Sequence, residues 1–179
     1  RGLRRDGLTI LCAVEAKILD SSGAIDLPAG LAGLDHLLIA DHQFPSHDGP
    51  MPPRAVREQL DAGQLTAAGV IDELVAATCR ALERSPFRPV AAHLFSVLPK
   101  MGLSEDQVGP EHLTALAAAC RSTGAAVEVN EKWHCPSPRV LRALLGEGVT
   151  LSASSDAHSV ADVGRWDYVD AMAVELSGA

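Results

Sequence analysis

Short apolar segments alternate with longer amphipathic segments along this chain, and this alternation constrains the fold more than any other feature. The apolar segments consist almost entirely of apolar or small residues, as do parallel strands that are covered on both faces. Six segments have this character: 8–15, 36–41, 89–93, 125–130, 150–155 and, as a further candidate, 171–175. Three segments carry apolar residues at helical spacing: 70–84, 110–121 and 137–145. Strands that alternate with helices predict an α/β fold with a parallel sheet.

Polar residues stand at the ends of five consecutive predicted strands. In chain order they are Glu15, then Asp41 and His42, then His93, then Glu128 and Asn130, and finally Asp156 and His158. Because the carboxyl ends of parallel strands meet at one face, we expect these side chains to lie close together. Neutral imidazoles and carboxylates are ligands that divalent Zn, Mn and Fe accept. The sequence therefore predicts a metal site at that face.

Each of these residues also has an explanation that needs no metal. Glu15 could form a structural salt bridge, and His93, which lies in an apolar strand end, could be a hydrogen-bonded core histidine. Asp156 could cap the next helix. Glu128 could orient an imidazole or point outward, and the sequence does not decide between the two. The agreement among five strand ends favours the metal site.

Loops on the same face supply candidate substrate contacts. Lys100 and Lys132 follow predicted strands and could bind phosphate oxygens, although each could equally be a solvated surface charge. His134 lies in the loop after the strand 125–130 and could contact a substrate. The proline-rich segment 43–53 is expected to be an irregular loop over this face.

Length and composition exclude several classes of protein. The 179 residues, of which 47% are hydrophobic, indicate a single globular domain spanning 1–179. A net charge of -8 and an aromatic content of 3% argue against a nucleic-acid-binding protein, which needs basic surfaces or stacking platforms. No apolar run reaches the length of a membrane span. The four cysteines form no CxxC pair, so we expect reduced thiols and a cytoplasmic location, with the oligomeric state left open.

Five segments resemble, in order, the motifs of the polymerase-and-histidinol-phosphatase (PHP) family. They are VEAKILDSSGAID (14–26), LDHLLIADH (34–42), PVAAHL (89–94), AAVEVNEKW (125–133) and GVTLSASSDAHSVADVG (148–164), of which the last is the most specific. Together they run through nearly the whole chain. The chain departs from the family pattern at Leu94, where the family has proline, and at Ser154, where it has glycine.

The resemblance implies a distorted (β/α)7 barrel of the PHP type that holds two or three divalent ions (Zn, Mn or Fe) at its C-terminal mouth. Glu15 would be a bridging carboxylate. His42, His93, Asp156 and His158 would be the further metal ligands, with Asp156 and His158 also catalytic. The family's opening H-x-H strand does not occur in this sequence. We therefore expect the chain to cover roughly the C-terminal two-thirds to three-quarters of the barrel.

The function implied by the resemblance is that of a metal-dependent hydrolase. It would be a phosphatase or phosphoesterase that hydrolyses a small phosphomonoester with metal-activated hydroxide. Three alternatives stay open: a non-catalytic or degenerate binding or regulatory module, a PHP domain attached to a polymerase, and a hydrolase of amides or esters. The acidity of the chain weighs against the polymerase. A small phosphorylated substrate is the partner that we expect.

Overall fold

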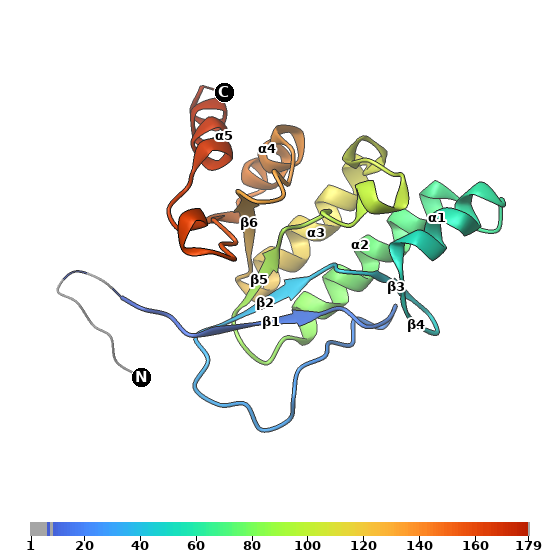
Figure 1. Cartoon of the computed structure of the whole chain (residues 1–179), viewed down its shortest axis with the longest axis horizontal. Coiled ribbons are helices and arrows are strands. Elements are labelled where there is room, and N and C mark those ends of the chain that lie inside the picture. Colours follow the sequence, from blue (N-terminus) through green and yellow to red (C-terminus); the bar gives the residue numbers. More distant parts are fainter. Residues whose placement is uncertain (1–6, 8, 179) are drawn as a thin grey trace.

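The computed structural model describes residue 7 and residues 9–178, and a five-stranded sheet lies at its centre (Figure 1). The strands are β1 (Ala13–Lys17), β2 (His36–Ala40), β5 (Pro89–Ala92), β6 (Ala126–Asn130) and β7 (Thr150–Ser154). All neighbouring pairs are parallel, and the order across the sheet is β1-β2-β5-β6-β7. The predicted α/β fold with a parallel sheet is confirmed, and the first five predicted strand segments each overlap one of these strands.

Helices connect β2 to β5, β5 to β6 and β6 to β7, and a last helix follows β7. They are α1 (Pro53–Asp61), α2 (Ala67–Arg84), α3 (Pro110–Thr123), α4 (Pro138–Gly146) and α5 (Asp167–Ser177). The short elements are the hairpin strands β3 (Phe44–Ser46) and β4 (Gly49–Met51) and the 3-10 helices η1 (Leu98–Met101), η2 (Glu105–Gln107) and η3 (Val160–Asp162). Within the part of the chain that the structure describes, no helix is both long enough and apolar enough to cross a bilayer.

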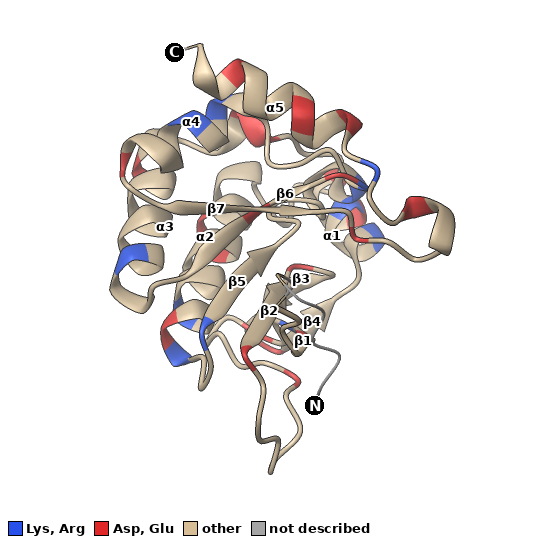
Figure 2. Ribbon diagram, turned by 90° about the vertical axis from the view of Figure 1, so that its left-hand side faces the viewer, with Lys and Arg blue, Asp and Glu red and all other residues tan. Residues whose placement is uncertain are grey.

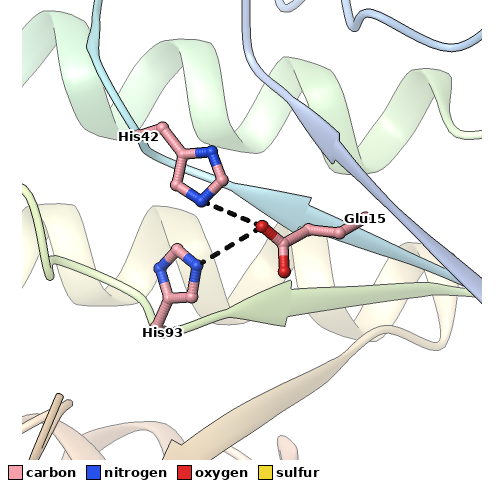
Figure 3. A group of neighbouring side chains, drawn as sticks. All are labelled: Glu15, His42 and His93. Carbon is pink, nitrogen blue, oxygen red and sulfur yellow. Dashed lines mark ion pairs between the residues drawn. The ribbon is translucent and has the colours of Figure 1, made fainter. Parts of the chain in front are cut away.

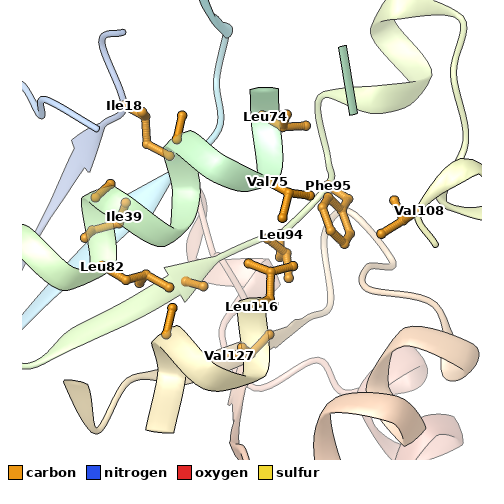
Figure 4. Close-up of a cluster of buried hydrophobic side chains, with 14 of the residues drawn as sticks. Ile18, Ile39, Leu74, Val75, Leu82, Leu94, Phe95, Val108, Leu116 and Val127 are labelled. Carbon is orange, nitrogen blue, oxygen red and sulfur yellow. The ribbon is translucent and has the colours of Figure 1, made fainter. Parts of the chain in front are cut away.

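One face of the sheet packs on α2 and α3 and forms the main core (Figure 4). Ile39 of β2 and Val127 of β6 point into this layer, where they join Leu74 and Leu82 of α2 and Leu116 of α3. All five side chains are almost completely buried. The period of 3.6 residues in the helices and of two in the strands thus brings the predicted apolar positions into one core.

A capping residue stands at the start of α2, and another stands at the end of α3. The Thr66 hydroxyl accepts a hydrogen bond from the backbone N–H of Gly69, at 3.1 Å, where α2 begins. α3 ends at Gly124, whose φ of 67° lies in the left-handed region that glycine adopts without a steric penalty. Because the helix ends there, the chain turns directly into β6, which carries Glu128 and Asn130.

The opposite face of the sheet carries Glu15. Alternation along β1 turns Ala16 into the core and Glu15 to the other side. The residue paired with Glu15 on β2 is Leu38, which in turn pairs with Val90 on β5, and both are only half-buried. A cavity of about 310 Å³ lies against this face, with Leu38, Val90 and Glu128 among its lining residues. The face that carries Glu15 is therefore more open than the face that packs on the helices.

The connection from β1 to β2 approaches α2 closely at Gly23. This residue has a φ of 76°, and a Cβ atom on it would lie 2.6 Å from Arg80 Cβ and from the backbone nitrogen of Ala81. The Arg80 guanidinium donates a hydrogen bond to the carbonyl oxygen of Ser21. Only glycine suits a position that is both left-handed and this crowded, so the turn fastens the end of β1 to α2.

The structure corrects three predictions. Glu15 lies in the middle of β1 and not at its end, because the strand continues beyond it to Lys17; residue 8 of the predicted segment lies outside the described residues. Segment 43–53 is not an irregular loop but contains the antiparallel hairpin of β3 and β4. Segment 171–175 is not a strand but lies within α5. A short apolar run does not distinguish a strand from a helix. The helix is favoured here because Glu131 accepts hydrogen bonds from two backbone N–H groups at the start of α5.

We expect Leu74→Ala to lower the free energy of unfolding by about 2–5 kcal/mol, because it leaves a cavity between α2 and the sheet. Leu74 is fully buried, whereas Leu145 on α4 is 45% exposed. Leu145→Ala is therefore the matched control, with an expected change within about 0.5 kcal/mol. Urea denaturation followed by circular dichroism measures both values, and equal losses would contradict this description of the core.

Candidate metal centre

Three predicted metal ligands come together from three neighbouring strands (Figure 3). Glu15 lies in β1, His42 follows β2 by two residues, and His93 comes directly after β5. Because β1, β2 and β5 are adjacent and parallel, Glu15 on the open face of β1 meets the two histidines that follow the ends of β2 and β5. The convergence predicted from the strand ends is confirmed for Glu15, His42 and His93, which we call the metal group.

The donor atoms of the metal group are close enough to bind one divalent ion. Glu15 Oε1 lies 2.9 Å from His42 Nε2 and 3.8 Å from His93 Nε2. One donor atom from each residue lies within 4.8 Å of the other two, and the two imidazole rings stack with centroids 5.1 Å apart. Two ligands of a tetrahedral zinc ion are about 3.4 Å apart. Small side-chain movements would therefore let two imidazoles and a carboxylate surround one ion.

Asp41 and Ser96 hold the imidazole of His93 from behind. His93 is 3% exposed, and its Nδ1 lies 3.0 Å from the Ser96 hydroxyl and 3.6 Å from Asp41 Oδ1. Asp41 is buried as well and accepts a hydrogen bond of 2.8 Å from the backbone N–H of Phe95. A carboxylate behind an imidazole orients the ring and makes the opposite nitrogen a better ligand. In this arrangement His93 Nε2 faces Glu15.

Glu128 supports the backbone of the same segment. Its Oε2 accepts hydrogen bonds from the backbone N–H of His93, at 2.9 Å, and from the side-chain amide of Asn130, at 3.1 Å. His93 and Phe95 have positive φ angles of 32° and 71°, a conformation that residues other than glycine rarely adopt. Glu128 is only 5% exposed and therefore does not point outward, but it binds the backbone of His93 and not an imidazole ring.

The charges of the metal group shift one another's pKa values. Hydrogen bonds from His42 and His93 lower the pKa of Glu15 well below its usual range. Burial works to lower the pKa of His93, but the nearby carboxylates of Asp41 and Glu15 outweigh it and raise the pKa to about 10. Complete burial raises the pKa of Asp41, although its hydrogen bond with His93 opposes this. A metal ion needs His93 in its neutral form, so metal binding at this group would release a proton.

Asp156 and His158 are not brought into the metal group. Asp156 has a φ of 46°, and its Oδ2 accepts a hydrogen bond of 3.0 Å from Trp133 Nε1. The Trp133 ring, which binds Asp156, lies 6.2 Å from the ring of His93. The His158 side chain is 66% exposed and lies 2.9 Å from Lys132 Nζ. The assignment of Asp156 and His158 as ligands and catalytic residues stays a prediction.

The three predicted substrate contacts lie around Trp133 and the loop that follows it. Lys100 Nζ is 4.1 Å and Lys132 Nζ 5.5 Å from the centre of the Trp133 ring. His134 stacks on Tyr168, with ring centroids 5.0 Å apart. Trp133 was not among the predicted site residues. The signal for it was a rare aromatic residue directly after a strand whose end carries polar groups.

No model of a known protein family matches the chain, and no curated protein matches its sequence. The geometry of the metal group and of its surroundings is therefore what bears on the function.

We expect Asp41→Asn to weaken the binding of Zn²⁺ or Mn²⁺ by about 10- to 100-fold, because the carboxylate that orients His93 loses its charge. Asp48 is exposed in the β3–β4 hairpin, so Asp48→Asn is a control of the same chemistry that should leave metal affinity unchanged. Isothermal titration calorimetry measures both affinities, and circular dichroism checks that the variants are folded. A folded Asp41→Asn protein with unchanged affinity would contradict the role of Asp41.

Proposed function

We propose that this protein is a metal-dependent phosphoesterase that hydrolyses a small phosphomonoester. The observation that carries the proposal is the metal group of Glu15, His42 and His93 at one edge of a parallel sheet. The resemblance of the chain to PHP motifs supports the same reaction class. Lys100 and Lys132 lie against the Trp133 ring, which is 6.2 Å from the ring of His93, and their positive charge favours an anionic substrate.

We also propose that the sheet is a segment of a PHP-type (β/α)7 barrel. The strand order β1-β2-β5-β6-β7 follows the chain without reversal. A doubly wound sheet reverses its strand order at a switch point, whereas consecutive strands of a barrel do not. The helices α2 and α3 cover one face, and Glu15 lies on the other, as an inward-facing residue of a barrel would.

The residues of the chain have distinct roles in this proposal. A divalent ion at the metal group supplies Lewis acidity and lowers the pKa of a bound water molecule toward neutrality. Glu15, His42 and His93 bind the ion, and Asp41 orients His93. Asp156, which accepts a hydrogen bond from the indole of Trp133, and the exposed His158 would complete the ligand set and transfer protons.

A non-catalytic binding module is the second candidate. The observation that favours it is that only three of the five predicted ligands form the metal group, while Asp156 and His158 lie outside it among the described residues. Such a protein would bind a metal ion without turnover. Metal binding and hydrolysis must therefore be measured separately.

We expect chelation to abolish hydrolysis of phosphomonoesters and added Mn²⁺ or Zn²⁺ to restore it, because the attacking water depends on the ion. The assay compares phosphomonoesters, phosphodiesters, amides and carboxyl esters, with metal content measured in parallel. Bound metal without hydrolysis of any substrate would favour the binding module. Faster cleavage of amides or carboxyl esters would contradict the proposed substrate class.

We expect His93→Ala and Asp156→Ala each to lower kcat/KM by about 10²-fold or more. His93→Ala should also lower the metal content, because it removes a member of the metal group. His47 is exposed in the turn of the β3–β4 hairpin, so His47→Ala is the control and should retain full activity. If either of the first two variants kept full activity, the role given to that residue would be wrong.

A further inference from the structure

Two of the three lysines in this chain lie against the same indole ring. Lys100 comes from η1 and Lys132 from the loop after β6, and their ammonium groups are 4.1 Å and 5.5 Å from the centre of the Trp133 ring. In the described part of the chain, neither ammonium forms an ion pair with a carboxylate, although the chain has 23 acidic residues, which are spread over its helices and loops (Figure 2). Positive charge without a carboxylate partner is thus concentrated at one place.

A pocket of about 340 Å³ opens next to Lys132. Its lining residues are Glu131, Lys132, His134, Ser155, Asp156, Asp162 and Arg165. None of them belongs to the metal group, so the pocket is a separate space. Trp133 joins the two sites, because its ring lies near His93 and its Nε1 donates a hydrogen bond to Asp156. Trp133 is thus the residue that lies next to both the pocket and the metal group.

The carboxylates of the pocket are engaged by hydrogen bonds within the chain. Glu131 accepts from two backbone N–H groups at the start of α5, Asp162 from the backbone and hydroxyl of Ser159, and Asp156 from Trp133. In contrast, Lys132 contacts only imidazole and indole groups among its described neighbours. The Arg165 guanidinium makes one long contact of 3.4 Å, with an exposed carboxylate. The cationic donors of the pocket therefore remain available to a ligand.

We propose that Lys132 and Arg165, with Lys100 beside them, bind a second anionic group of the substrate, a phosphate or a carboxylate. This inference rests on the proposed function, in which the metal group acts on the phosphoryl group that is hydrolysed. The ammonium groups supply charge, the guanidinium of Arg165 forms paired hydrogen bonds, and the indole holds the lysines in place.

Binding of inorganic phosphate to the metal-free protein tests the pocket without turnover. The chain has two tryptophans, so a ¹⁵N-labelled sample has two indole N–H signals, and Trp133→Phe identifies that of Trp133. At constant ionic strength, phosphate should shift the Trp133 signal with a dissociation constant of about a few millimolar. Lys132→Met and Arg165→Met should each weaken binding by about tenfold. Acetate in a parallel titration distinguishes a carboxylate site from a phosphate site.

Two control variants locate the binding. Arg54→Met removes a cation from the exposed side of α1, where the side chain is 90% exposed, and should leave phosphate affinity unchanged. His42→Ala disrupts the metal group but not the pocket, so it should also bind phosphate normally. The absence of a saturable shift with either anion, or equal affinity in Lys132→Met and the unaltered protein, would overturn the inference.

The substrate class is tested with the metal-loaded protein. Phosphoglycolate carries a carboxylate that ethyl phosphate lacks, so kcat/KM should be about tenfold higher for phosphoglycolate and this ratio should approach one in Lys132→Met. A ratio of one in the unaltered protein would contradict the second anionic group. Phosphate binding without any hydrolysis would contradict the proposed function alone, whereas hydrolysis without phosphate binding would contradict the pocket alone.

Discussion

The turn after β5 depends on two buried carboxylates that accept hydrogen bonds from its backbone. Glu128 binds the N–H of His93, and Asp41 binds the N–H of Phe95. A buried carboxylate is costly unless it is hydrogen-bonded, and a left-handed backbone is costly unless its surroundings hold it. Here the backbone N–H groups satisfy the buried carboxylates, and the carboxylates hold the left-handed backbone in place. As a result, Leu94 and Phe95 enter the core while His93 turns toward Glu15, so one turn joins the packing of the fold to the candidate site.

The electrostatics of the site follow from the same arrangement. His93 is buried between two carboxylates, which raise the pKa of its imidazole although burial alone would lower it. His42 lies nearer the surface and forms the shorter contact with Glu15. The metal group thus combines one ligand that Asp41 and Ser96 hold rigidly with two that can adjust. This division suits a site whose donors must move slightly to surround an ion.

The sequence was most informative where one physical rule applies to many residues. Continuous apolar strands and strand-end polar residues predicted the parallel sheet and the convergence of Glu15, His42 and His93, because parallel strands leave little choice of geometry. The rule fails for single segments: the short, mostly apolar segment 171–175 fits a strand as well as a helix, and it lies in α5. The roles of Ser96 and Trp133 depend on loop conformation, to which no periodicity applies. Barrel closure and the part played by Asp156 and His158 stay predictions.

The crowded turn at Gly23 bears on how this protein can diverge. A side chain at that position would collide with the backbone of α2, so a descendant could accept one only by moving α2 away from β1. Such a movement would also displace the strand that presents Glu15. The identity of residue 23 and the position of the Glu15 carboxylate are therefore linked through the packing of α2. Glycine at this point, more than the loop around it, would mark homologues that share the geometry of the site.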